Sequence, residues 1–337
     1  MFRRAYAVCV YSIYLLGRGY LSGGKKDAVE LLIDSGAEVN VKNNEGKTPL
    51  DNASKLGYKD IAELLKTKGA KGETTMRKRP KKIIAAQYKQ EALEGPIKFT
   101  ILYDNYRYAE DTKPDWGFSC LIEGTEKTIL FDTGTNPDIL FHNVEQLNVD
   151  LQKVEQIVIS HNHFDHTGGL LTVLERNPDV SVYLPVSFPY EFIRDVEAKK
   201  AEVTSVYEPE EISANVFSTG EMGEAIKEQS LILNTKKGLI IVTGCSHQGI
   251  VEIIKHADKL FDKPIYLVFG GFHLGGKPAA ELQEIITSFK EIGVEKCGAT
   301  HCTGDQAIEM FKKAYGKDYI PMGTGRILEL EKEKGIK

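Results

Sequence analysis

The segment of the sequence most informative about the fold is Ile157-Val-Ile-Ser-His161-Asn-His163-Phe-Asp165-His166-Thr-Gly-Gly-Leu170. Its apolar first half is typical of a buried strand, and a helix is expected to begin near the two glycines. Side chains on such a strand-to-helix loop can converge on one point. His161 and His163 are two residues apart, so in an extended segment they project to the same side and can bind one metal ion. Asp165 and His166 lie past the bend, where they can reach a second ion.

The residue types in this stretch indicate which metal it would hold. Imidazole nitrogens with one carboxylate suit zinc or iron better than magnesium. A chance cluster does not explain four potential ligands so close together in a chain with eight histidines. We therefore expect a divalent metal cofactor, zinc in the first place, at a site that can hold two ions. Iron and manganese are the alternatives.

Three further histidines follow apolar or small residues and stand beside glycines, which permit close approach of the backbone to a ligand. They are candidate metal ligands: His247, His273 and His301. The remaining two, His142 and His256, fall in predicted helices, where a lone histidine is usually a packing or surface residue.

The residues from about Ile97 onward alternate between strand-like and helix-like patterns. Strands are expected at residues 99–103, 118–122, 128–131, 157–160, 181–184, 231–233, 239–243, 265–269 and 327–330. Helices are expected at residues 137–147, 170–176, 250–260, 279–292 and 306–314. This order predicts an α/β sandwich in which helices cover two packed sheets.

The spacing His161-x-His163-x-Asp165-His166, with Leu130-Phe-Asp132-Thr-Gly134 upstream, resembles the metallo-β-lactamase superfamily. A narrower set of blocks is similar to the 7,8-dihydropterin-6-yl-methyl-4-(β-D-ribofuranosyl)aminobenzene 5′-phosphate synthase-like group over residues 97–331. These blocks are Ile101-Leu-Tyr-Asp-Asn105, Trp116-Gly-Phe-Ser119, Asp132-Thr-Gly134, Gly244-Cys-Ser-His247, Gly270-Gly-Phe-His273, His301-Cys-Thr-Gly304 and Gly323-Thr-Gly325.

The resemblance implies a four-layer αββα fold with a metal site at one edge of the sandwich. It implies that His301 is the final ligand and that Asp132 orients a metal-binding group without being a ligand itself. One departure from the superfamily pattern matters. Gly244-Cys-Ser-His247 occupies the place of the usual bridging aspartate. The sequence therefore leaves open which of His247 and His273 replaces a ligand and which contacts substrate.

The expected chemistry is metal-assisted hydrolysis or group transfer on a small phosphate- or ester-bearing molecule, and the resemblance implies a dihydropterin 5′-phosphate synthase-like reaction as one form of it. Asp165 and His247 are the candidate catalytic residues. Asn105, Gly168 and Gly169 are candidate substrate contacts, although the two glycines serve equally well for tight packing. Trp116, Phe118 and Tyr103 are candidates for stacking on a ring, with core packing as the alternative for each.

Two rival functions are compatible with the same residues. One is another enzyme of this fold, such as a phosphodiesterase, lactonase or thioesterase. The other is a non-catalytic binding protein tethered to a repeat domain. The net charge of −5 gives no reason to expect nucleic-acid binding.

Residues 25–72 resemble ankyrin repeats and form a short all-α segment before the catalytic domain. Gly36 and Gly69 recur at the ankyrin period of 33 residues, each where a helix needs a left-handed cap. Thr48-Pro49-Leu50 is expected to open a helix. One apolar helix face is expected from Leu31, Leu32, Leu64 and Leu65. Such repeats can dock a protein partner or serve only as a structural cap.

The other segments are less specific. Residues 1–24 predict an apolar helix or a signal-like segment, residues 73–96 a basic linker, and residues 97–337 the catalytic domain. The five cysteines form no C-x-x-C pair, which favours a reducing compartment. We expect a cytoplasmic protein without a membrane span, or an exported one if residues 3–16 act as a signal peptide.

Elemental analysis of the protein purified without added metal tests the predicted site. We expect about two zinc or iron ions per chain in the wild type and loss of most of them in His163→Ala, because that variant lacks one imidazole ligand. Absence of metal in both proteins, with equal stability, would contradict the enzyme interpretation.

Overall fold

The computed structural model describes residues 25–34, 36–40, 48–55, 59–71 and 92–330. The predicted N-terminal segment 1–24 and residues 73–91 of the predicted linker lie outside the described residues. The chain divides into two compact units, of which the larger comprises Lys82–Val186 and Asp195–Lys337. The end of the predicted linker belongs to the α/β fold, because the Leu93 N–H donates to Asn234 O at 2.9 Å.

The repeat segment contains three helices: α2 (Lys25–Asp34), α3 (Pro49–Lys55) and α4 (Lys59–Thr67). Gly36 and Gly69 have φ angles of +90° and +84°, which confirms the predicted left-handed caps. The predicted helix start at Pro49 is also confirmed. Thr48 and Asp51 cap this helix reciprocally. The Thr48 N–H donates to Asp51 Oδ2 at 2.8 Å, and the Asp51 N–H donates to Thr48 Oγ1 at 3.2 Å.

The predicted apolar face of this segment was wrong at one position. Leu31 is 69% exposed, whereas Val29 is fully buried. Val29, Leu32 and Ile33 have the i, i+3, i+4 spacing of one helix face, and Leu31 lies roughly 200° around the helix from Val29. The core of the segment is formed by Val29, Leu50, Ala53, Ile61, Ala62, Leu64 and Leu65.

The α/β unit contains two sheets. The seven-stranded sheet has the order β13 (Ile327–Leu330), β1 (Ile97–Tyr103), β2 (Ser119–Glu123), β3 (Ile129–Phe131), β4 (Gln156–Val158), β5 (Ser181–Pro185) and β6 (Glu202–Val206). The six-stranded sheet has the order β12 (Lys296–Thr300), β11 (Ile265–Gly271), β10 (Gly238–Thr243), β9 (Leu231–Thr235), β8 (Val216–Ser218) and β7 (Glu210–Ser213).

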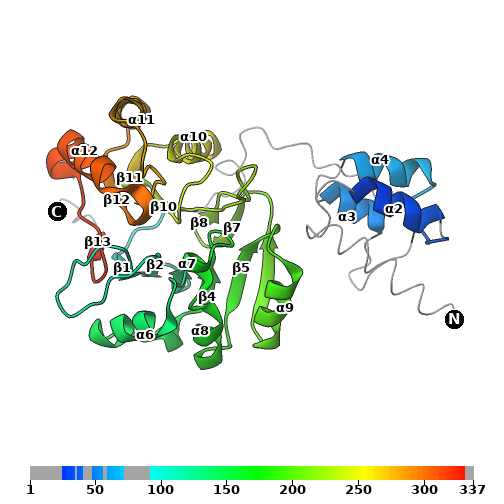
Figure 1. Cartoon of the computed structure of the whole chain (residues 1–337), viewed down its shortest axis with the longest axis horizontal. Coiled ribbons are helices and arrows are strands. Elements are labelled where there is room, and N and C mark those ends of the chain that lie inside the picture. The colour runs from blue at the N-terminus through cyan, green and yellow to red at the C-terminus, as the bar shows by residue number, and fades with distance from the viewer. Residues whose placement is uncertain (1–24, 35, 41–47, 56–58, 72–91, 331–337) are drawn as a thin grey trace. The chain divides into compact units, whose positions relative to one another are not determined.

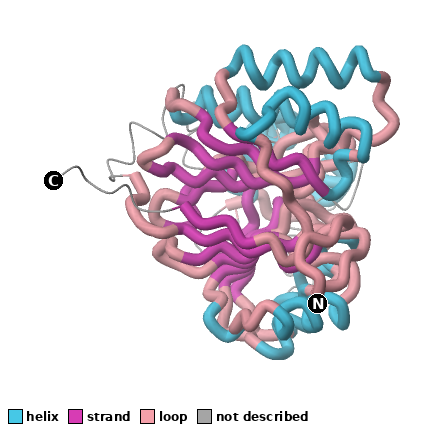
Figure 2. Tube along the Cα trace, turned by 90° about the vertical axis from the view of Figure 1, so that its left-hand side faces the viewer, coloured by secondary structure: helices cyan, strands magenta, loops and turns pink. Residues whose placement is uncertain are grey.

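Helices cover the outer face of each sheet, so the predicted four-layer αββα sandwich is confirmed (Figures 1 and 2). The six-stranded sheet is covered by α10 (Ile250–Phe261), α11 (Ala279–Ile292) and α12 (Asp305–Tyr315). The seven-stranded sheet is covered by α6 (Pro137–Gln146) and α8 (Leu170–Arg176). The remaining α-helices of the α/β fold are α7 (Phe164–Thr167) and α9 (Tyr190–Ala198).

Strand β10 shows why these layers form. Ile240 and Val242 point into the core between the two sheets, whereas Leu239 and Ile241 point into the core beneath the helices. A strand buried on both faces needs a continuous apolar run rather than alternation, which is what residues 239–242 supply. Between the sheets, the rings of Phe99 and Phe269 pack edge to face with centroids 5.2 Å apart.

Several elements were not predicted from the sequence: β6, β7, β8, β12, α7 and α9. Strand β12 reads Lys-Cys-Gly-Ala-Thr, which has few residues with strand preference, and it forms because it pairs in parallel with β11. Asp165 and His166 lie in helix α7, not in the loop predicted for them. The four described cysteines are buried and free. Within the described ranges, every helix is too short or too polar to cross a bilayer.

The parallel strands determine where functional residues gather. Strands β3 and β4 are parallel, with Phe131 beside Val158. Strands β10, β11 and β12 are parallel as well, with Gly271 beside Thr300. The carboxyl ends of parallel strands meet at one edge of a sheet, and ligands of open α/β sheets bind there. The segments that follow β4, β10, β11 and β12 carry all the candidate metal ligands named from the sequence, and Asp132 follows β3.

Substitution of Phe269 tests the contact between the sheets. Phe269→Ala is expected to lower the free energy of unfolding by about 3–5 kcal/mol, because it leaves a cavity between two buried sheets. Ile327→Ala is the control, since Ile327 on edge strand β13 is exposed. Chemical denaturation would measure both, and equal small losses would contradict the assigned core.

Candidate metal centre

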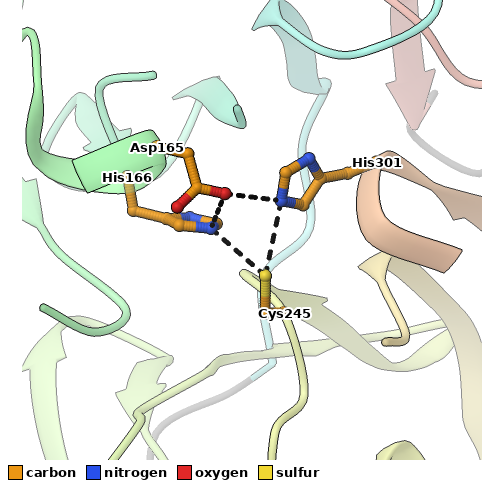
Figure 3. A group of neighbouring side chains, drawn as sticks. All are labelled: Asp165, His166, Cys245 and His301. Atoms are coloured by element: carbon orange, nitrogen blue, oxygen red, sulfur yellow. Dashed lines mark hydrogen bonds and ion pairs between the residues drawn. The ribbon is translucent and has the colours of Figure 1, made fainter. Parts of the chain in front are cut away.

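The first group of donor atoms is Asp165, His166, Cys245 and His301 (Figure 3). Asp165 and His166 come from α7, Cys245 follows β10, and His301 follows β12. The Cys245 Sγ lies 3.3 Å from His166 Nε2 and 3.4 Å from His301 Nε2. Asp165 Oδ2 lies 3.4 Å from each of the same two nitrogens. These four side chains therefore surround one point from several directions, as a tetrahedral metal site requires.

A second group of donors lies beside the first and comprises His161, Cys245 and His247. His161 Nε2 lies 3.2 Å from His247 Nε2 and 3.0 Å from His163 Nδ1. Each of these ring nitrogens can offer a lone pair to a metal ion when the proton of its ring is on the other nitrogen. The residues present therefore fit a metal ion here as well.

Cys245 belongs to both groups, and sequence reasoning missed it. The signal was present, because Gly244-Cys-Ser-His247 occupies the place of the superfamily's bridging aspartate. The prediction looked to the histidines for the replacement ligand. The structure instead places the cysteine thiol between the two donor groups and His247 in the second of them. A thiolate is a soft ligand that favours zinc or iron.

His273 belongs to a third group of possible donors, which it forms with Cys245 and Cys302. Its ring centroid is 4.3 Å from that of His247. His273 is exposed, whereas His161, His166 and His301 are buried. Both roles that the sequence left open for His273, metal ligand and substrate contact, are compatible with this position.

Hydrogen bonds fix the orientation of the His166 ring. The Asp132 carboxylate accepts from the Ser160 backbone N–H at 2.7 Å and from the Ser160 hydroxyl at 2.8 Å. Its Oδ2 also lies 2.7 Å from His166 Nδ1. The opposite nitrogen, Nε2, is thereby turned toward Cys245 and Asp165. This geometry is what the orienting role predicted for Asp132 requires.

Asn105 holds the His301 ring in the same manner. Its Oδ1 lies 2.9 Å from His301 Nδ1 and accepts from the Gly117 N–H at 3.0 Å, while its Nδ2 donates to His301 O at 3.1 Å. Both ends of the amide are engaged with the protein. The placement favours a positioning role for Asn105 over the substrate contact predicted from the sequence.

Glu228 positions the loop that carries Cys245, and sequence reasoning did not single it out. Its fully buried carboxylate accepts backbone N–H bonds from Cys245 at 2.7 Å, Ser246 at 2.9 Å and His247 at 2.9 Å. Burial raises the pKa of Glu228. The three bonds fix the backbone that links the cysteine ligand candidate to the histidine ligand candidate.

The charges at the centre follow from burial and contact. Burial lowers the pKa of His161 far below its ordinary value and lowers the pKa of His247 to about 4. Burial alone would also lower the pKa of His166, but Asp132 outweighs it and raises the pKa to about 10. Burial would raise the pKa of Asp165, yet hydrogen bonds with His166 and His301 hold it well below the usual range. The neutral imidazoles of His161 and His247 are in the form that a metal ion needs.

The two thiols at the centre differ. A hydrogen bond with Cys302, together with burial, raises the pKa of Cys245. Burial would raise the pKa of Cys302, but hydrogen bonds with Cys245 and His273 lower it. Between the two, negative charge is therefore more stable on Cys302 before a cation binds. A coordinated thiol loses its proton, so binding of an ion would shift the charge to Cys245.

Backbone strain is concentrated at this edge of the sheets. Asp132, Ser246, His273 and His301 have φ angles of +57°, +64°, +52° and +51°. Residues other than glycine rarely adopt this region, and such strain persists at sites where function requires it. Each of these residues lies one to three positions after a parallel strand.

The two candidate glycines are packed against backbone. The Gly168 N–H donates to Gly134 O and to Phe164 O, both at 2.9 Å. A Cβ at Gly168 would lie 1.9 Å from Thr135 O, and one at Gly169 would lie 2.5 Å from Thr133 O. This arrangement favours tight packing, the alternative left open from the sequence, over anion binding.

The three aromatic residues that are candidates for stacking on a ring differ in burial. Tyr103 and Phe118 are fully buried in the core, whereas Trp116 is exposed.

The two helical histidines lie outside the donor groups. His142 Nε2 is 3.3 Å from Asp111 O, and His256 Nε2 is 3.1 Å from Thr219 O.

Comparison with known proteins agrees with this geometry. The family model described as the metallo-β-lactamase superfamily matches residues 114–253, and that of ankyrin repeats matches residues 20–76. The chain is 31% identical over 274 residues to the 7,8-dihydropterin-6-methyl-4-(β-D-ribofuranosyl)-aminobenzene-5′-phosphate synthase of Methanocaldococcus jannaschii. That alignment covers 66% of this chain and 93% of the relative.

Two further comparisons extend this result. A second protein of Methanocaldococcus jannaschii, whose name states no function, is 32% identical over 240 residues, which cover 62% of this chain and 91% of that protein. Among solved structures, a metal-dependent hydrolase of the β-lactamase superfamily is similar with a TM-score of 0.60 and 27% identity. The similarity covers 70% of this chain and 99% of that structure.

The fold and the donor groups define an enzyme-type domain with candidate ligands for a divalent metal at the edge of an αββα sandwich. The chain belongs to the metallo-β-lactamase superfamily and carries ankyrin repeats at its N-terminus.

Removal of the shared thiol tests its assignment. Cys245→Ala is expected to lower the occupancy of both ion sites, because the thiol adjoins both donor groups. Loss of a ligand to a single ion would lower the occupancy of one site only. Cys297→Ala is the matched control, since Cys297 is also buried but lies in the core beneath the helices. Elemental analysis measures both variants. Full metal content in Cys245→Ala would show that the thiol is not a ligand.

Proposed function

We propose that this protein is a metal-dependent hydrolase or transferase that acts on a small phosphate- or ester-bearing substrate. The observation that carries the proposal is the convergence of two donor groups on the Cys245 thiol. Such an arrangement brings two ion sites close together, as in the binuclear centres that catalyse displacement at phosphoryl and acyl groups. Zinc is the expected metal because of the thiol and the imidazoles, with iron as the alternative.

The proposed ligands divide between two ions. Asp165, His166 and His301 would hold one, and His161, His163 and His247 the other, with Cys245 shared. When bound, the ions would supply a nucleophile activated at neutral pH and stabilise negative charge that develops on the substrate.

The protein supplies orientation and proton control. Asp132 and Asn105 each engage the Nδ1 of one histidine and so direct its Nε2 inward. The Asp165 carboxylate would stay ionised beside a bound ion, and its other oxygen could accept a hydrogen bond from the attacking group. His247 keeps a neutral ring beside His273. His273 is exposed and lies beside His247 of the second donor group, so we assign substrate contact to His273.

Two reactions have support from different relatives. The relative at 31% identity is named a synthase, which favours transfer of a methyl-linked pterin to an aminobenzene that carries a ribofuranosyl phosphate. The similar solved structure is described as a metal-dependent hydrolase, which favours attack by water on an ester. In the first case the amine nitrogen would attack the methyl carbon of an activated pterin and displace the leaving group on that carbon. In the second case water would attack the ester and release its alcohol. The same donor groups serve both.

The repeats and the free thiols suggest a cellular context. Ankyrin repeats commonly present a binding surface, so we propose a protein partner for residues 25–70. The described cysteines are free, which supports a reducing compartment and therefore a cytoplasmic location.

Product analysis of the metal-loaded protein tests the proposed function. Incubation with phosphoesters and carboxylic esters, and separately with an activated pterin and an aminobenzene riboside phosphate, would distinguish the two reactions. We expect turnover in one of these sets. No turnover in either set by a protein with full metal content would move the assignment to a binding protein with this fold.

Asp132→Asn tests the orienting contact within the same assay. We expect turnover or metal affinity to fall about 10- to 100-fold, as for other residues that orient metal-binding histidines. Asp138→Asn is the control, because Asp138 is exposed in the first turn of α6. Equal turnover in the two variants would show that Asp132 does not support the metal centre.

A further inference from the structure

Two large aromatic side chains are exposed beside the metal centre. Trp116 is 57% exposed and Phe164 is 68% exposed. Most other large aromatic residues of the α/β fold are buried, among them Tyr103, Phe118, Phe131 and Phe269. Folding gains from burial of such rings, so packing alone does not explain why these two remain in contact with solvent.

Both residues are close to the proposed ligands, Trp116 in space and Phe164 along the chain. The Trp116 ring centroid lies 5.5 Å from that of His301, and the two planes are tilted by 54°. Phe164 stands between His163 and Asp165 in the sequence and is the first residue of α7. The Trp116 ring therefore borders the first donor group, and the backbone of Phe164 lies between two proposed ligands.

The two segments that carry these rings are in direct contact. The Phe118 N–H donates to Asp165 O at 3.2 Å. A Cβ at Gly117, which has a φ angle of +148°, would lie only 2.6 Å from the same oxygen. Glycine at this position permits the backbone after Trp116 to approach the backbone after Phe164. The two aromatic residues thus precede a single point of close contact.

Rings in this position suit one class of ligand. Small-molecule sites are lined mainly by apolar and aromatic side chains around a few polar groups, and here the polar groups are the proposed ligands. An aromatic side chain gains most from contact with another flat ring, by offset or edge-to-face packing.

We propose that Trp116 and Phe164 form a subsite for a flat aromatic ring of the substrate, which places the reacting group of that substrate over the metal centre. The inference rests on the proposed function, because it assumes that the substrate reaches the metal ligands. It narrows the substrate class from any small phosphate or ester to one that carries a planar ring. A phosphate ester without a ring would lack this contact.

The sequence provides a direct probe of the subsite, because Trp116 is the only tryptophan in the chain. Fluorescence of the metal-loaded protein, excited at the tryptophan band, therefore reports on this one position. We would titrate it with 4-aminobenzoate, with pterin and with ribose 5-phosphate. N-acetyltryptophanamide, titrated in parallel, corrects for light absorbed by the probes.

Saturable change of the Trp116 emission is expected with a ring-bearing probe and not with ribose 5-phosphate. In Phe164→Ala the Kd for the ring-bearing probe should rise about tenfold, which is in the range found for stacking of one base on an aromatic side chain. Tyr108→Ala is the matched control, since Tyr108 is also an exposed aromatic residue but contacts Arg326 instead of the metal centre. Its Kd should equal that of the wild type.

Calorimetry covers the variants that lack the fluorophore. Trp116→Ala should weaken binding of the ring-bearing probe about tenfold, and Trp116→Phe should restore most of it, because phenylalanine keeps a stacking face. Metal content, measured for each variant, should stay at the wild-type level. A fall in metal content together with weaker binding would assign these residues to support of the metal centre and overturn the subsite.

The remaining outcomes separate this inference from the proposed function. Equal Kd values in wild type, Phe164→Ala and Trp116→Ala, or binding of ribose 5-phosphate alone, would overturn the subsite and leave metal-dependent catalysis standing. Ring binding with the expected variant effects, but no turnover of any substrate by the metal-loaded protein, would support the subsite and overturn the catalytic proposal.

Discussion

The structure depends on one constraint, which is that nitrogen, oxygen and sulfur donors from separate loops must meet at a single edge of two packed sheets. The Cys245 thiol is the point where they meet, because it adjoins both donor groups. Parallel strands make the meeting possible. Strands β3 and β4 deliver Asp132 and His161 from one sheet, and β10 and β12 deliver Cys245 and His301 from the other.

Holding so many polar groups away from water is costly unless each has a partner. Hydrogen bonds to the groups that carry the candidate ligands offset this cost. Asp132 and Asn105 engage the outer nitrogens of His166 and His301, and Glu228 accepts three backbone N–H groups of the Cys245 loop. Positive φ angles at four residues around the edge show that the backbone is bent away from its preferred conformations to keep these contacts.

The rim of the centre has the opposite character. Trp116 and Phe164 remain exposed although the fold buries most of its other large rings, and Gly117 allows their segments to touch. A rigid polar centre with an apolar rim is the usual composition of a small-molecule site. The helical repeats, by contrast, have a small core of their own around Val29 and Leu65.

The order of the layers and most of the candidate donor residues could be predicted from the sequence. Helices α8 and α11 have the predicted bounds, and β10 reads as a strand buried on both faces, because local periodicity reflects local burial. It did not determine β12, whose residues have little strand preference, or the inward face of α2, where Leu31 was chosen in place of Val29. In both cases neighbours distant in sequence decide the outcome.

For the site, the sequence identified His161, His163, Asp165, His166 and His301 as candidates, because four of them stand in one short run with metal-binding spacing. The tertiary structure was needed to show that the Cys245 thiol adjoins all the donor groups, that His247 lies with His161 whereas His273 lies with Cys302, and that Trp116 is exposed. The physical reason is distance. A sequence shows which chemical groups are available, but loops joined by strands and helices must fold before it is fixed which groups lie within a few ångströms of one another.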